Sequence, residues 1–264
     1  VIRKKFDFKL LRLALKEGAT FAENKKVTDI KIKNHGAEIL LDNNDTIKSK
    51  MLIGADGVWS QVSKKTGLCN KLTNYGTCIV EEFKVEEKFM DEFFGKSRLC
   101  HIFSQPEKIN GYGWVFPKKE HLNIGIGKFT SKEKHTGKNL LDVFMKYINV
   151  LKKNDVIPKS IKVKNYKGAV LPIIPLDKTY CNRVILLGDA AGFASASTGE
   201  GLYYAMRSAK LATEVIERGL QTNNLSKDFL STYQALWKKD FGKDLNLFYK
   251  NRKITNRKKL ELIY

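Results

Sequence analysis

The run from residue 183 to 217, RVILLGDAAGFASASTGEGLYYAMRSAKLATEVIE, constrains the fold of this chain more than any other segment. Residues 184–187 are apolar and partly β-branched, and they are followed by Gly188 and a lone acid, Asp189. This pattern predicts a buried strand. After the TGEG segment, apolar residues recur at helical spacing at positions 202, 205, 206, 209, 212, 215 and 216. The run therefore predicts the strand, turn and helix of an open α/β sheet, which binds ligands at the carboxyl ends of its strands.

Several residues of this run are candidates for binding. Asp189 could accept hydrogen bonds from sugar-like hydroxyls at the strand end. Ala190, Ala191 and Gly192 are so small that a flat ligand or another backbone could approach closely. Gly201 opens the helix, whose first N–H groups would stabilise an anion or a ring that becomes anionic on reduction. The alternative is an ordinary turn in which Asp189 is only a turn or cap residue.

Three separated segments resemble the flavoproteins related to p-hydroxybenzoate hydroxylase. The first combines Arg3 and Asp7, in an expected helix, with the strand that carries Val27. The second is Gly54-Ala55-Asp56-Gly57, which is similar to the GADG motif of that group. Plain turn chemistry explains Asp56 equally well. The third is the run described above, whose GDAAG and TGEG resemble the segment that contacts the flavin ribityl chain and ring.

A further motif points to a subfamily. Residues 112–117, YGWVFP, are followed after seven residues by Gly125-Ile126-Gly127. This spacing resembles the YxWxFP and GxG pattern of geranylgeranyl reductases. Tyr112, Trp114 and Phe116 alternate along an expected strand, so they share one face, and large aromatic side chains suit a tunnel for a prenyl chain. The alternation alone fits the core face of an antiparallel sheet just as well.

The resemblance implies an FAD-dependent oxidoreductase that reduces C=C bonds of geranylgeranyl or other isoprenoid or prenylated lipids. It implies a prenyl or lipid substrate and NAD(P)H or ferredoxin as electron donor. The residues that it assigns to FAD are Arg3, Val27, Asp56, Gly188, Asp189, Gly199, Gly201 and Leu202. The residues that it assigns to the prenyl substrate are Tyr112, Trp114 and Phe116. It identifies no catalytic proton donor. A monooxygenase or halogenase of the same superfamily is the alternative enzyme.

One expected motif is absent from the sequence. No G-x-G-x-x-G stands between a strand and a helix, although this loop holds the pyrophosphate of a dinucleotide. We therefore expect that the chain lacks the first segment of the family and that it binds flavin weakly or not at all. A second alternative follows, in which the chain is a truncated, non-catalytic basic protein that binds anionic surfaces.

Composition bears on the partners. The 48 Lys and Arg against 28 Asp and Glu give a formal charge of +20, which could attract the chain to an anionic membrane surface. The basic residues are spread along the chain, so we expect no nucleic acid partner. Residues 238–259 mix basic and aromatic residues and could form an amphipathic membrane-facing helix, or merely a solvated one. No apolar run approaches the roughly 20 residues of a membrane span, so we expect a cytoplasmic protein that could be peripheral on the membrane.

The four cysteines include no C-x-x-C pair and the four histidines no ligand spacing, so no metal is expected. The fold class expected is α/β with mixed α+β character. An incomplete Rossmann-like FAD-binding domain (1–67 and 177–220) would contain an inserted antiparallel substrate sheet (68–176), and a helical region (221–264) would follow. The elements expected are helices over 3–16, 60–65, 140–151 and from 225 onward with Ser226 as N-cap, and strands over 27–32, 38–41, 51–53, 77–85, 99–104, 112–116 and 122–126.

Overall fold

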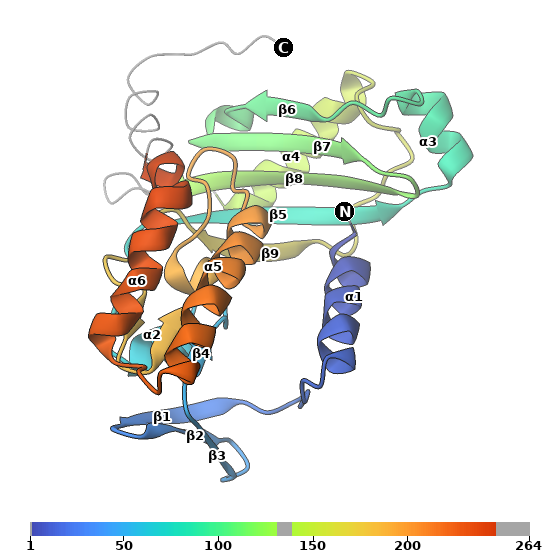
Figure 1. Ribbon diagram of the computed structural model, residues 1–264. Helices are drawn as coiled ribbons and strands as arrows, with labels where there is room; N and C mark the ends of the chain where they lie inside the picture. The colour runs from blue at the N-terminus through green and yellow to red at the C-terminus, as the bar shows by residue number, and fades with distance from the viewer. Residues whose placement is uncertain (1, 131–138, 247–264) are drawn as a thin grey trace.

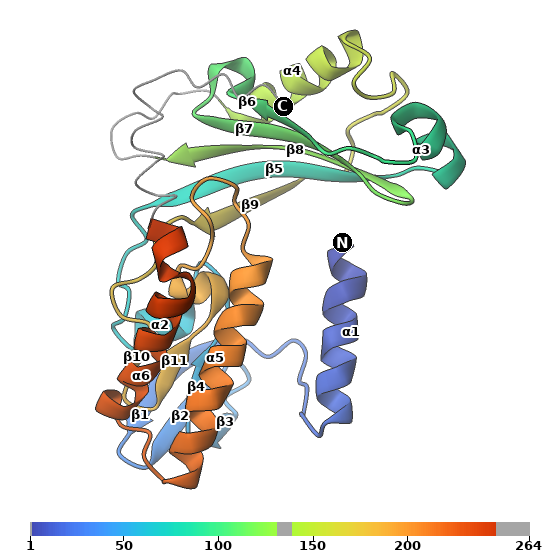
Figure 2. The same ribbon diagram turned by 45° about the horizontal axis from the view of Figure 1, so that its top comes forward.

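The computed structural model describes residues 2–130 and 139–246. Figure 1 shows a broad antiparallel sheet above a second part, in which short strands pack against helices. Figure 2 shows helix α4 (Leu140–Lys153) on one side of the broad sheet, with helices α5 (Leu202–Gln221) and α6 (Lys227–Trp237) on the other side. The broad sheet therefore has one face toward its own helix and one face toward the rest of the molecule.

The broad sheet has five strands in the order β6-β7-β8-β5-β9, and each neighbouring pair is antiparallel. The strands are β5 (Tyr75–Lys84), β6 (His101–Ser104), β7 (Gly111–Pro117), β8 (His121–Thr130) and β9 (Lys167–Pro172). Side chains that alternate along β7 and β8, such as Val115, Ile124 and Ile126, are fully buried in one core with Phe144 of α4. This alternation is what an antiparallel sheet with one covered face requires. Helix α3 (Glu87–Phe94) and the 3-10 helix η1 (Pro106–Lys108) lie in the connections between strands.

A second sheet lies in the other part of the molecule. Strands β4 (Leu52–Gly54) and β11 (Val184–Leu186) are parallel, and β10 (Tyr180–Cys181) joins β11 antiparallel. All three residues of β11 are fully buried, as expected for a parallel strand covered on both faces. The hydroxyl of Tyr233 in α6 donates a hydrogen bond to the carbonyl of Leu186 at 3.0 Å, so α6 is tied to the end of this strand.

The third sheet is a small antiparallel one. Its strands are β1 (Val27–Lys33), β2 (Gly36–Leu41) and β3 (Thr46–Ser49), in that order. The short helix α2 (Gln61–Lys65) follows β4. Helix α1 (Arg3–Lys16) has no buried residue, and the apolar side chains of Phe8 and Leu13 are 60% and 51% exposed. Figure 2 shows α1 standing apart from α5.

The structure confirms most of the expected elements. Helix 3–16 is α1, the hairpin is β1 and β2, and Ser226 is the N-cap of α6, where its Oγ accepts the N–H of Phe229. Sequence patterns missed β3, α3, β9 and β10, and they missed the π-helical turn η3 (Lys238–Gly242) that continues α6. Of the basic segment 238–259, residues 247–259 lie outside the described part.

Buried side chains gather into two large clusters. One includes β11, α5 and α6 together with Ile30 and Val62, and the other lies between the broad sheet and α4. Trp237 of α6 and Phe193 share the first cluster, with ring centroids 4.7 Å apart. The expected domain boundaries at 67/68, 176/177 and 220/221 stay predictions.

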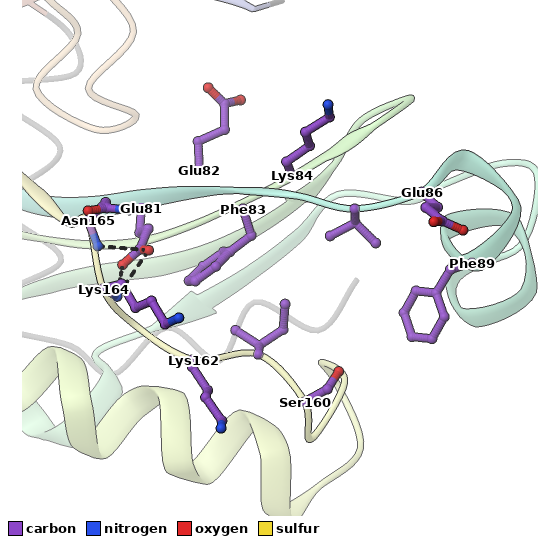
Figure 3. A pocket seen from close by; sticks show the side chains of 12 residues that line it. Glu81, Glu82, Phe83, Lys84, Glu86, Phe89, Ser160, Lys162, Lys164 and Asn165 are labelled. Carbon is purple, nitrogen blue, oxygen red and sulfur yellow. Dashed lines mark hydrogen bonds between the residues drawn. The ribbon is translucent and has the colours of Figure 1, made fainter.

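A buried carboxylate fixes the connection from α4 to β9. Glu81 on β5 is only 5% exposed, and its oxygens accept the backbone N–H groups of Lys164 at 3.0 and 3.1 Å and of Asn165 at 3.0 Å. Figure 3 shows this contact at the wall of a groove of about 660 Å³ between the end of β5, the start of α3 and residues 160–165. None of the predicted site residues lines this groove.

We expect Glu81→Leu to lower the free energy of unfolding by roughly 2–4 kcal/mol. The substitution leaves the N–H groups of Lys164 and Asn165 without their acceptor, and an unsatisfied group costs about 1–3 kcal/mol. Urea denaturation measures the loss. Glu82→Leu is the matched control, since Glu82 is more exposed and forms an ion pair with Lys118, and such pairs contribute about 1 kcal/mol or less. Equal losses in the two variants would contradict the role given to Glu81.

Candidate cofactor and substrate site

The expected strand, turn and helix run is present and begins the site. Strand β11 leads into the 3-10 turn η2 (Gly188–Ala191), and the chain then reaches α5 through residues 192–201. The N–H of Gly188 donates to the Oγ of Ser208 in α5 at 3.2 Å. At Gly192, with φ +83°, a Cβ would lie 2.3 Å from the carbonyl oxygen of Ile174. Of the two uses foreseen for a small residue at this position, the close approach of another backbone is the one observed.

Asp189 occupies the position expected of a ligand-binding acid. It is half-buried at the carboxyl end of β11, and a Cβ on Gly201 would lie only 3.4 Å from its Oδ1. Burial raises the pKa of this carboxyl, and the positive charge of Arg3 partly offsets the effect. Within residues 2–130 and 139–246, no donor makes a hydrogen bond to its two carboxyl oxygens. Gly201 thus lies beside the Asp189 carboxyl, and the charge of Arg3 acts on the same carboxyl. Arg3 also forms an exposed ion pair with Asp7 at 3.0 Å.

The loop before α5 is organised by its own hydrogen bonds. The N–H of Ser195 donates to the carbonyl of Glu200 at 2.8 Å, and the N–H of Gly199 donates to the carbonyl of Ser195 at 2.9 Å. The carboxylate of Glu200 accepts the N–H of Tyr203 at 2.7 Å. In the part of the chain that the structure describes, the N–H groups of Gly201 and Leu202 have no acceptor. A helix N-terminus with two unpaired donors favours a negative or polarisable group.

Aromatic side chains cover the face of the broad sheet that α4 does not cover. Tyr112, Trp114 and Phe116 are half-buried and alternate with buried residues along β7. Their ring centroids follow one another at 5.6 and 6.2 Å, and Phe129 on β8 lies 6.3 Å from Tyr112. We call these four residues the aromatic row. The expectation that the three β7 aromatics share a face is confirmed.

The two glycines of the GxG motif make room for one ring of this row. A Cβ on Gly125 would lie 2.2 Å from Cζ2 of Trp114, and a Cβ on Gly127 would lie 3.7 Å from Cζ3 of the same ring. The indole therefore lies across β8 at the glycine positions. Its Nε1–H donates to the Oδ1 of Asn123 at 2.8 Å. Sequence patterns did not single out Asn123, although it stands two residues before the first glycine of the motif.

Tyr112 joins the aromatic row to the loop before α5. Its hydroxyl donates a hydrogen bond to the carbonyl of Thr198, and a Cβ on Gly199 would lie 3.1 Å from that hydroxyl. Burial raises the pKa of Tyr112 to about 12, so at neutral pH the phenol keeps its proton and remains a donor. The predicted substrate residues and the predicted cofactor loop thus meet at this contact, which no sequence spacing could reveal because 86 residues separate the partners.

The remaining predicted residues lie differently. Asp56 follows β4, the parallel neighbour of β11, and its oxygens accept the hydroxyl of Ser60 at 2.6 Å and the N–H groups of Gln61 and Val62 at 2.7 and 3.1 Å. This is the turn chemistry that was the alternative explanation of Asp56. Val27 begins β1 and packs on two hydrophobic clusters. A role of either residue in cofactor binding stays a prediction.

Two features are absent from the described residues. No cluster of three or more His, Cys, Asp or Glu side chains with the geometry to hold a metal ion occurs there. None of the described helices combines the length and the apolar character that crossing a membrane requires.

Solved structures define the class of fold. The halogenase PltM in complex with phloroglucinol and FAD is similar with a TM-score of 0.70 at 19% identity, over 96% of this chain and 52% of that one. A geranylgeranyl bacteriochlorophyll reductase-like protein from Thermoplasma acidophilum is similar with a TM-score of 0.80 at 22% identity, over 95% of this chain and 62% of that one. The chain therefore shares the fold of these two proteins.

Sequence comparison is more specific than the fold. Residues 78–163 match the model of the geranylgeranyl reductase catalytic domain. The digeranylgeranylglycerophospholipid reductase of Methanococcus vannielii is 31% identical over 257 residues, which are 93% of this chain and 61% of that protein. Residues 78–163 thus match the catalytic domain of the geranylgeranyl reductases, and most of the chain is similar to digeranylgeranylglycerophospholipid reductases. The chain spans about three fifths of the length of the Methanococcus vannielii protein.

Proposed function

We propose that this chain forms the flavin-ring and substrate part of an FAD-dependent reductase that saturates C=C bonds of a geranylgeranyl or other prenylated lipid. The observation that carries the proposal is the contact between Tyr112 and Thr198, where the aromatic row meets the loop before α5. On one side of this contact lie large apolar rings suited to a hydrocarbon chain. On the other side lie the N–H groups of Gly201 and Leu202 and the carboxylate of Asp189, none of which has a hydrogen-bond partner among the described residues.

These residues fit parts of FAD. Asp189 would accept a hydrogen bond from a ribityl hydroxyl, the N–H groups of Gly201 and Leu202 would face the ring, and Gly188 and Gly199 would lie near it. Arg3 would face the phosphates, and no G-x-G-x-x-G loop accompanies it in this sequence. When bound and reduced by the electron donor, FAD would supply a hydride to one alkene carbon, and a proton would complete the other carbon. NAD(P)H or ferredoxin would be the source of electrons.

The chain itself contributes orientation and exclusion of water. The aromatic row would hold the prenyl chain against the broad sheet, and burial of its apolar surface provides the binding free energy. Tyr112 holds its proton for the Thr198 carbonyl, so it fixes the loop relative to the row. No side chain is assigned as the proton donor.

We expect the purified chain to hold little flavin. With excess FAD, dithionite and no oxygen, we expect it to saturate a geranylgeranyl lipid, and mass spectrometry of the lipid measures the product. Trp114→Ala is the control for the aromatic row. Tightly held stoichiometric flavin would contradict the expectation of weak binding. Hydroxylated or halogenated product in air, without anaerobic saturation, would instead support the monooxygenase or halogenase alternative.

We also propose that the protein is cytoplasmic and associates peripherally with anionic membrane, since a charge of +20 favours an anionic surface. Co-sedimentation with vesicles containing phosphatidylserine should fall steeply when salt rises from about 0.1 M to 1 M, because the Debye length falls from about 10 Å to about 3 Å. Neutral phosphatidylcholine vesicles are the control. Binding that is equal on both vesicles and insensitive to salt would contradict an electrostatic association.

A further inference from the structure

One polar contact orients the largest ring of the aromatic row. The indole Nε1–H of Trp114 donates to the Oδ1 of Asn123 at 2.8 Å, and the indole has no other hydrogen bond in the described part of the chain. Both side chains belong to the same face of the sheet, because Trp114 pairs with Gly125 and Asn123 lies two residues before that glycine on β8. The contact therefore runs diagonally between neighbouring strands.

The rest of the surroundings leaves the ring little other support. Gly125 and Gly127 lie under the indole and offer no side chain to hold its edge. The neighbouring rings of Tyr112 and Phe116 are at 5.6 and 6.2 Å between centroids, and the interplanar angles are 45° and 28°. These rings limit movement along β7 but make no directional bond. The hydrogen bond to Asn123 is the one contact that specifies the position of the indole edge.

We propose that Asn123 is a positioning residue for prenyl binding, which acts by holding the indole of Trp114 flat over Gly125 and Gly127. This inference rests on the proposed function of the aromatic row as the prenyl site. A flat, fixed indole presents a smooth apolar surface to a linear isoprenoid. A released indole could turn on its χ angles toward the space that the prenyl chain would occupy, and ordering it again on binding would weaken affinity.

The neighbours of Asn123 determine which substitution is informative. Asn123 pairs with Phe116 on β7 and with Glu82 on β5, so an aspartate there would face Glu82 and introduce a second effect. Leucine has nearly the same size and lacks the acceptor, so Asn123→Leu tests the hydrogen bond. Asn154→Leu makes the same chemical change at the exposed C-cap of α4 and is the matched control.

The experiment is a double-mutant cycle on the full chain. Isothermal titration with geranylgeranyl diphosphate gives the dissociation constant for the unchanged protein, Asn123→Leu, Trp114→Phe and the double variant. We expect Asn123→Leu to weaken binding about three- to tenfold, in line with one hydrogen bond. In the Trp114→Phe background, which has no indole N–H, the same change should have little further effect. Asn154→Leu should bind like the unchanged protein.

A second measurement follows the ring without ligand. The near-ultraviolet circular dichroism of Trp114, obtained as the difference from Trp114→Phe, should weaken in Asn123→Leu because a mobile indole loses its fixed asymmetric surroundings. An unchanged difference spectrum would overturn the inference, as would equal effects of Asn123→Leu in both backgrounds. Asn123→Ala repeats both measurements if the leucine variant does not fold. Failure of the unchanged protein to bind the probe, with the spectral change present, would count against the prenyl site and not against the orienting bond.

Discussion

Asp189→Asn should weaken FAD binding about tenfold or more and, at neutral pH, make the free chain more stable. The affinity falls because an amide is a weaker acceptor than a carboxylate for a ribityl hydroxyl, and hydrogen bonds to charged groups contribute about 1.5–3 kcal/mol. The stability rises because the carboxylate is half-buried and no donor in the described part of the chain bonds to it. Fluorescence titration with FAD and thermal unfolding measure the two effects.

The pH dependence has a definite sign. Burial raises the folded-state pKa of Asp189 above its ordinary value of 3.8. Between that value and the raised one, the folded chain keeps a proton that the unfolded chain has released. The free energy of unfolding therefore falls as pH rises through this window, and it stays lowered at neutral pH. An asparagine does not titrate, so the variant should lose this part of the pH dependence.

Asp56→Asn is the matched control, because it makes the same chemical change at the other motif acid. The carboxylate of Asp56 accepts the first two N–H groups of α2 and the hydroxyl of its N-cap residue, Ser60. We expect this variant to lose about 0.5–1.5 kcal/mol of stability, because an amide accepts these hydrogen bonds less well than a carboxylate; this is the opposite direction to Asp189→Asn. If Asp189→Asn left both FAD affinity and stability unchanged, the assignment of Asp189 to the cofactor would be wrong.

Gly125→Ala should displace Trp114 and destabilise the chain by roughly 1–3 kcal/mol, the usual cost of overpacking. The added Cβ would lie 2.2 Å from a carbon of the indole ring, and ring atoms cannot move as the end of a flexible chain does. We expect affinity for a prenyl probe to fall as well, because the moved indole would intrude on the aromatic row. Urea denaturation and calorimetric titration measure the two losses.

The second glycine of the motif provides the control. A Cβ on Gly127 would lie 3.7 Å from its nearest neighbours, which is an ordinary contact. Gly127→Ala should therefore retain stability to within about 0.5 kcal/mol, as expected where no cavity, overpacking or strain arises. Equal destabilisation by the two alanines would show that the indole does not depend on Gly125 in the way we describe.

Local patterns were sufficient for much of the fold. The spacing of apolar residues predicted the bounds of α1, and Ser226 marked the start of α6. Strand β9 was missed because residues 167–172 carry little alternation and end at Pro172, and they become a strand only by pairing with β5. Helix α3 was missed because eight residues, with Phe93 and Phe94 adjacent, give too short a pattern.

Local patterns also predicted the residues of the candidate site but not the contacts between them. The residues on β7 and at the start of α5 could be found from motif spacing, because each motif is a continuous segment. The contacts that relate them could not. The hydrogen bond from Tyr112 to Thr198 and the bond from Trp114 to Asn123 depend on how strands and loops pack, and neither partner carries a local signal of the other. Asp56 differs, because its contacts are local. It lies in a motif that resembles a cofactor segment, and its carboxylate binds the first N–H groups of the following helix, α2.

The contact between Gly125 and Trp114 also limits how this sequence can evolve. With the indole in place, any side chain at position 125 meets the ring. The glycine is therefore required as long as Trp114 stands opposite it on the neighbouring strand. Replacement of the tryptophan by a smaller residue must come first, and only then does position 125 become free to vary. The order of the two substitutions matters, and lineages that retain the indole should retain the glycine with it.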